Sequence, residues 1–75
     1  MQTAAPQQPD PGERFQRYTG RSISIVDALE AIGQPSSYAD RKRIAAANGI
    51  ADYRGTAAQN LRLLAALKAG TLRRP

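Results

Sequence analysis

The side chains of this chain that could do chemistry are polar residues that recur at a fixed spacing ahead of apolar runs. The sequence contains neither cysteine nor histidine, which excludes zinc sites built on those ligands, Cys–His dyads and Ser–His–Asp triads. Carboxylates remain, but a Ser or Thr followed three residues later by an acid or amide is the pattern of a helix capping box. The pairs with this spacing are Ser24–Asp27, Ser37–Asp40 and Thr56–Gln59. We therefore expect no enzyme, no metal site and no cofactor.

Two polar residues, Arg41 and Asn60, are not explained by capping and are the main candidates for a binding site. On a helical wheel, Arg41 lies in the middle of the inward face of its predicted helix, and Asn60 lies among the leucines of the next helix. Such groups are seldom buried unless they are hydrogen-bonded. The favoured interpretation is that both side chains bond to the backbone of the loop 49–55. The alternative is that they line a groove for a polar ligand.

Aromatic and basic residues extend this set of candidates. Tyr38 is predicted to face inward, and Tyr53 is expected to anchor the loop 49–55 in the core. Both tyrosines are expected either to be half-buried with surface hydroxyls or to stack on a sugar or base. Lys42, Arg43 and Arg54 are candidates for contacts with a polyanion. For Lys42 and Arg43, a solvated helix face is an equally good interpretation. The net charge of +5 and the pI near 10.5 suit an anionic partner, which could be nucleic acid, a membrane surface or a cell-wall polymer.

Three capped helices must position these side chains. Each capping box precedes an apolar-periodic run and then a glycine, which closes a helix in the left-handed conformation. These start and stop signals predict helices over residues 25–32, 38–48 and 57–69, which end at Gly33, Gly49 and Gly70. The fold class is therefore all-α, a compact bundle of three short helices around an Ile, Leu and Ala core. The last helix is expected to bury a broad stripe made of Leu61, Leu63, Leu64 and Leu67.

The flanking segments divide the chain further. Residues 1–12 are rich in Pro, Gln and Ala without periodicity, which predicts a disordered N-terminal tail or linker. Residues 13–21 are a basic-aromatic lead-in, whose Phe15 and Tyr18 either lie on the helical unit, the favoured interpretation, or touch a polyanion. No apolar run is long enough for a membrane span, and no signal peptide is recognised. The remaining units are the three-helix module, 22–70, and an end expected to fray, 71–75.

The order and spacing of several short motifs resemble a module that follows the catalytic domain of bacterial and phage cell-wall hydrolases, the amidase-type and lysozyme-type endolysins. A similar pattern occurs in uncharacterised small bacterial proteins. One departure is Pro35, because an Asp usually precedes the Ser-Ser pair in that family. The matching pieces cover about two thirds of the chain and are Ser24-Ile25-Val26-Asp27, Ser36-Ser37, Arg41 with Ile44-Ala45, Gly49-Ile50, Tyr53-x-Gly55-Thr56-Ala57-Ala58-Gln59-Asn60 and Leu63-Leu64.

The resemblance implies a non-catalytic role in binding peptidoglycan or an associated anionic cell-wall polymer. For that role the candidate binding residues are the four identified above: Tyr38, Arg41, Tyr53 and Asn60. The location would be the cell wall for a module of a hydrolase and the cytoplasm for a free-standing protein. Two other functions stay open. One is a small nucleic-acid-binding protein that uses helix 38–48 in a helix-turn-helix; the other is a protein-interaction adaptor. The oligomeric state is not determined by the sequence.

Overall fold

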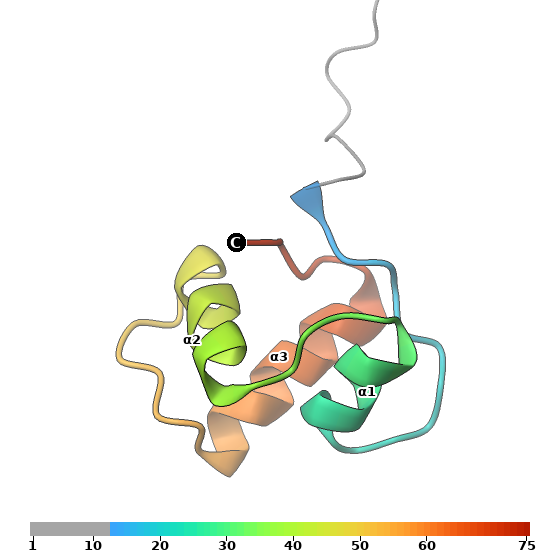
Figure 1. Cartoon of the computed structure of the whole chain (residues 1–75), viewed down its shortest axis with the longest axis horizontal. Helices are drawn as coiled ribbons and strands as arrows, with labels where there is room; N and C mark the ends of the chain where they lie inside the picture. The colour runs from blue at the N-terminus through green and yellow to red at the C-terminus, as the bar shows by residue number, and fades with distance from the viewer. Residues whose placement is uncertain (1–12) are drawn as a thin grey trace, which may run out of the picture.

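The computed structural model describes residues 13–75, and the predicted tail, residues 1–12, lies outside this range. The described chain forms α1 (Ile25–Ala31), α2 (Tyr38–Ala47) and α3 (Ala57–Ala69), with α1 packed against α3 (Figure 1). Between residues 13 and 75 there is no strand, and an isolated antiparallel bridge joins Arg14 to Arg73. The predicted all-α fold of three helices is confirmed. No helix of this described part is long and apolar enough to cross a membrane.

Local capping explains where the helices begin and end. Both halves of the capping box are present in α2 and α3. In α1 the Ser24 hydroxyl accepts from the Asp27 N–H at 3.3 Å, but the Ser24 N–H donates to Ser22 Oγ at 3.0 Å. The predicted bond from the Ser24 N–H to the Asp27 side chain is therefore wrong, because the Ser22 hydroxyl accepts that N–H instead. The glycines predicted to close the helices, Gly33, Gly49 and Gly70, all have positive φ.

The core between the helices also takes in residues from both flanking segments. Phe15 exposes 6% of its surface and Leu72 exposes 1%. Tyr18 packs against the same core, so the aromatic residues of the lead-in lie on the helical unit, as the favoured interpretation has it. Full burial of a large apolar side chain contributes about 1.5–3 kcal/mol. Residues outside 22–70 therefore supply an appreciable part of a small core.

Residues 72–74 are hydrogen-bonded to other parts of the fold, which differs from the frayed end expected from the sequence. The Phe15 N–H donates to the Leu72 carbonyl at 3.0 Å, and the Arg74 N–H donates to the Glu13 carbonyl at 2.7 Å. The sequence did not indicate these contacts, because the partners of this segment are distant along the chain and no local pattern points to them.

Asn48, the C-cap of α2, holds the same segment. Its side-chain amide donates to the Arg73 carbonyl at 2.9 Å, and its side-chain oxygen accepts from the Arg73 N–H at 2.8 Å. The amide also donates to the Ile44 carbonyl at 2.7 Å. We call residues 13–15, residues 72–74 and Asn48 the terminal clasp, because they tie both ends of the described chain to α2.

Two residues predicted to face inward lie at the surface: Tyr38 is 48% exposed and Leu61 is 55% exposed. At 3.6 residues per turn, Leu61 lies roughly 110° from the centre of the buried face of α3, so the predicted stripe was too broad. Tyr38 is the first residue of α2 and is half-exposed, whereas Tyr53, in the loop after α2, is 3% exposed and belongs to the core.

Candidate functional site

The four residues predicted to form a binding face lie together in the structure. They come from the first turn of α2, the loop after it and the first turn of α3. Hydrogen bonds join the side chains of Arg41, Tyr53 and Asn60, and the Tyr38 hydroxyl donates to the backbone carbonyl of Tyr53. We call them the tyrosine–arginine cluster: Tyr38, Arg41, Tyr53 and Asn60. Their proximity results from the fold, because the loop 49–55 carries the second tyrosine back to the start of α2 and α3.

Arg41 is the centre of this cluster. Its Nη1 donates to Tyr53 Oη at 2.9 Å and to Asn60 Oδ1 at 3.3 Å, and its Nε donates to the Ser36 carbonyl at 3.1 Å. A guanidinium carries five donors in a planar fork, so one side chain links the turn before α2, the loop after it and α3. Arg41 was expected to bond to the backbone of the loop 49–55. It bonds instead to the side chain of Tyr53 in that loop, and the backbone carbonyl that it does contact, that of Ser36, precedes α2.

Asn60 and Tyr53 complete the network from the other side. Asn60 Oδ1 also accepts from the Tyr53 hydroxyl, and Asn60 Nδ2 donates to the Gly55 carbonyl at 3.3 Å, which is the kind of loop contact expected for Asn60. Tyr53 is almost fully buried, which agrees with its expected role as an anchor of the loop 49–55 in the core and not with a half-buried ring. Its hydroxyl is not at the surface but lies between Arg41 and Asn60, because these two polar groups need a partner inside the fold.

Tyr38 is the exposed aromatic member of the cluster, and its ring is held in place. Its hydroxyl donates to the Tyr53 carbonyl at 3.1 Å, and the two rings lie 5.6 Å apart with a tilt of 36°. Arg41 Cζ lies 6.0 Å from the Tyr38 ring centroid. Gly55, with φ of +72°, packs so closely that a Cβ there would come 3.3 Å from Tyr38 Cε1. The result is a fixed, half-exposed aromatic surface beside a guanidinium.

The basic residues predicted to contact a polyanion differ in their surroundings. Arg43 pairs with Asp40 on α2, and Arg54 pairs with Asp52 at 3.1 Å, whereas Lys42 lies exposed on α2. Exposed pairs of this kind contribute about 0–1 kcal/mol, and the acids offset part of the charge that the arginines offer. The polyanion contacts therefore stay a prediction.

The helix-turn-helix alternative is not favoured by this geometry. Arg41 is the residue that α2 would present to a base edge, but its Nε and Nη1 already donate to groups of the fold. The same guanidinium atoms cannot also make the bidentate contact that reads a base.

In residues 13–75, no three His, Cys, Asp or Glu side chains gather to hold a metal ion. The pKa of Asp40 is lowered, chiefly by the Ser37 hydroxyl, which donates to it at 2.6 Å; this outweighs an opposing effect of desolvation, and the Ser37 amide and Arg43 lower it further. A carboxylate kept ionised at a helix cap lacks the raised pKa of a general acid. The tyrosine–arginine cluster presents the half-exposed ring of Tyr38 beside the Arg41 guanidinium.

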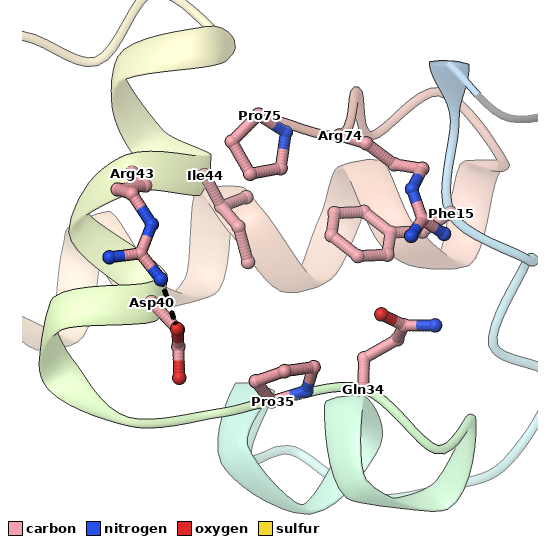
Figure 2. Close-up of a pocket in the computed structure, with 8 residues that line it drawn as sticks. All are labelled: Phe15, Gln34, Pro35, Asp40, Arg43, Ile44, Arg74 and Pro75. Atoms are coloured by element: carbon pink, nitrogen blue, oxygen red, sulfur yellow. Dashed lines mark hydrogen bonds and ion pairs between the residues drawn. The ribbon is translucent and has the colours of Figure 1, made fainter.

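A second feature, not indicated by the sequence, is a cleft of about 190 Å³ between α2 and the terminal clasp. We call it the terminal cleft (Figure 2). No local pattern could have shown it, because its walls come from separate segments that only the clasp brings together. The residues that line it are Phe15, Gln34, Pro35, Asp40, Arg43, Ile44, Arg74 and Pro75.

Comparison with known proteins relates the chain to phage endolysins. It is 49% identical over 49 residues to the L-alanyl-D-glutamate peptidase of Listeria phage A118, a match that covers 65% of this chain and 17% of that protein. It is 44% identical over 48 residues to the endolysin of Listeria phage A511, covering 64% of this chain and 14% of that protein. The chain therefore spans about one sixth of each relative's length or less. No protein-family model and no solved structure matches it.

Proposed function

We propose that this chain is a non-catalytic module that binds the bacterial cell wall, through peptidoglycan or an associated anionic polymer. The observation that carries the proposal is the match to the phage peptidase. The matched segment is 49% identical to this chain, and it makes up only 17% of the peptidase. Domains of about 100–150 residues are the commonest size, so a shared segment of 49 residues suits an accessory unit of a hydrolase better than its catalytic domain. The lack of cysteine and histidine supports the same view.

The charge of the chain fits this target. The peptidase is named for L-alanyl-D-glutamate, an acidic peptide unit, and a wall that displays such units carries carboxylates. A net charge of +5 raises the local concentration of an anionic polymer at the protein surface, and this attraction weakens as salt is added.

Within the tyrosine–arginine cluster, the structure supports different roles for the four residues. Tyr38 exposes about half of its surface and is the member that a polymer reaches most directly, with Arg41 beside it. Tyr53 is buried, and Asn60 is half-buried; both hold Arg41. We therefore propose Tyr38 as the main contact residue, with Arg41 contributing through Nη2, since its Nε and Nη1 donate within the fold. Tyr53 and Asn60 are then positioning residues.

The test is sedimentation of the chain with purified peptidoglycan sacculi at low salt. The wild-type chain is expected in the pellet. Tyr38→Ala should bind about two- to tenfold more weakly, because an aromatic contact contributes about 0.5–1.5 kcal/mol. Leu61→Ala is the matched control, since Leu61 is similarly exposed, at 55% against 48%, and should bind like the wild type.

The two possible failures have different meanings. A wild-type chain that stays wholly in the supernatant contradicts the proposed function. A wild-type chain that sediments, with Tyr38→Ala binding equally well, leaves the function standing and removes the tyrosine–arginine cluster as its contact surface. Circular dichroism of each variant confirms that the helices are intact.

A further inference from the structure

The terminal cleft combines an apolar lining with charged groups at its edges. Phe15, Pro35 and Ile44 supply the apolar lining, and Arg43 and Arg74 lie on opposite sides of the cleft (Figure 2). This cleft is distinct from the tyrosine–arginine cluster, because none of the four cluster residues lines it. A pocket with an apolar body and a few convergent polar groups is the usual form of a small-ligand site.

The side chains that line the cleft carry two guanidinium groups and one carboxylate. That carboxylate, Asp40, is already paired with Arg43 and bonded to Ser37. Arg74 instead lies over the Phe15 ring, with Cζ 5.3 Å from the ring centroid. This cation–π contact holds the guanidinium at the rim of the cleft, so little conformational freedom is lost when an anion binds to it.

The cleft is built from parts that are tied together. The Arg74 N–H is bonded to Glu13, and the Phe15 N–H is bonded to Leu72, so the two residues that form one wall are fixed by the terminal clasp. The opposite wall is α2. Gln34, in the turn between α1 and α2, directs its side-chain amide into the space between them (Figure 2).

We propose that the terminal cleft binds a short acidic peptide, with a carboxylate at Arg74 and a small apolar side chain against Ile44 and Pro35. A volume of about 190 Å³ is below the roughly 300–1,000 Å³ typical of sites for drug-sized ligands, so it accepts about one residue of such a peptide. The choice of a peptide, rather than another carboxylate, rests on the proposed function, because the wall carries short acidic peptides.

The test is a titration of the ¹⁵N-labelled full chain, followed by amide chemical shifts. The probe is N-acetyl-L-alanyl-D-glutamate, and its neutral counterpart is the same dipeptide with both carboxylates converted to amides. The acidic probe is expected to shift the amides of Phe15, Gln34 and Ile44, and the neutral one is not. Added salt should weaken the binding, since the ion pair is exposed.

Two variants test whether the carboxylate of the probe binds beside Arg74. Arg74→Gln should weaken binding about fivefold, the effect of one unit charge near contact in water. Gln34→Glu changes the size of the side chain very little but adds a negative charge inside the cleft, so it should weaken binding by a similar factor. Arg62→Gln is the matched control, because Arg62 is exposed on α3 away from the cleft, and it should bind like the wild type.

Several outcomes overturn the proposal: no shifts at the cleft, equal shifts with the neutral dipeptide, or equal shifts with inorganic phosphate, which would show general anion binding. If the chain binds sacculi but fails these tests, the peptide site in the cleft is rejected and the proposed function still holds. The reverse result is a chain that does not bind sacculi but binds the dipeptide at Phe15 and Ile44, with weaker binding in Arg74→Gln. This result supports the peptide site in the cleft and rejects the proposed function.

Discussion

Arg41 bonds to three separate parts of the chain: the Ser36 carbonyl before α2, the Tyr53 hydroxyl in the following loop and the Asn60 side chain in α3. Hydrogen bonds that involve a charged group contribute about 1.5–3 kcal/mol each when they are sheltered from water. This protein has no disulfide, so such bonds matter for holding the loop 49–55 against the helices.

Replacing Arg41 by lysine tests this structural role. Lysine keeps the charge but cannot reproduce the planar fork, so Arg41→Lys should lower the free energy of unfolding by about 1–3 kcal/mol. Urea denaturation followed by circular dichroism measures the change. Arg62→Lys, a change of the same type at an exposed position of α3, is the control and should be neutral. Equal stability of the two variants would show that the network contributes little.

At the scale of elements, α2 depends on its two ends. It buries only Ile44 and Ala45 of its ten residues, and packing of an apolar face is what usually stabilises a short helix. The Ser37–Asp40 capping box therefore matters at its start, and the bonds of Asn48 to Ile44 and Arg73 matter at its end.

The capping box predicts a pH dependence of stability. The folded pKa of Asp40 lies below the ordinary 3.8 because of the Ser37 hydroxyl. A lowered pKa in the folded state contributes stability that is present above the unfolded pKa and is lost as pH falls through the folded pKa. Thermal melts should therefore show wild type exceeding Asp40→Asn in stability near neutral pH, with the difference shrinking below pH 3.8.

Asp27→Asn is the control for this prediction. Asp27 also stands three residues after a cap serine, but it does not accept the N–H of Ser24, which is taken by Ser22. Its replacement should cost less stability near neutral pH than that of Asp40. A constant difference between wild type and Asp40→Asn down to strongly acidic pH would contradict an ionised cap.

Asn48→Ala should open the terminal clasp. Both bonds to Arg73 and the bond to Ile44 are lost, at a cost of about 1–2 kcal/mol. Hydrogen exchange of the Arg73 amide should accelerate more than that of amides in α1. Asn48→Asp keeps an oxygen for the Arg73 N–H but loses the donor to the Arg73 carbonyl, so its effect should be intermediate. Unchanged hydrogen exchange of the Arg73 amide in Asn48→Ala would contradict the role of Asn48 in the terminal clasp.

For the whole molecule, the clasp closes a core that three short helices leave open. Leu72 and Leu61 provide a matched pair, at 1% and 55% exposure. Leu72→Ala should destabilise by about 2–5 kcal/mol, the usual cost of removing a buried leucine side chain. Leu61→Ala should change stability by less than about 0.5 kcal/mol, as surface substitutions do. Similar denaturation midpoints for the two variants would place Leu72 outside the core.

The same reasoning predicts the extent of the folding unit. A core this small supplies no more than about 3–5 kcal/mol. A fragment of residues 22–70 lacks both Phe15 and Leu72 and should be largely unfolded by circular dichroism. A fragment of residues 13–75 should melt like the full chain. A cooperative melt of the shorter fragment at the same temperature would show that the module ends where the sequence pattern ends.

The helices and part of the site could be predicted because their causes are local. Capping boxes, glycine stops and apolar periodicity act within one or two turns, so they located all three helices to within one residue. The helical wheel also singled out Arg41 and Asn60 as polar groups in need of partners. It could not identify Tyr53 as their shared partner, because that depends on the path of the loop.

The sequence by itself determined where the chain is helical and which side chains were candidates for binding. The tertiary structure decided that Tyr38 is exposed and Tyr53 buried, that Phe15 and Leu72 complete the core, and that the terminal cleft exists. The physical reason is distance along the chain: the bonds between Asn48 and Arg73 or Arg41 and Asn60 join residues 25 and 19 positions apart. Such contacts form only when the whole fold brings their partners together.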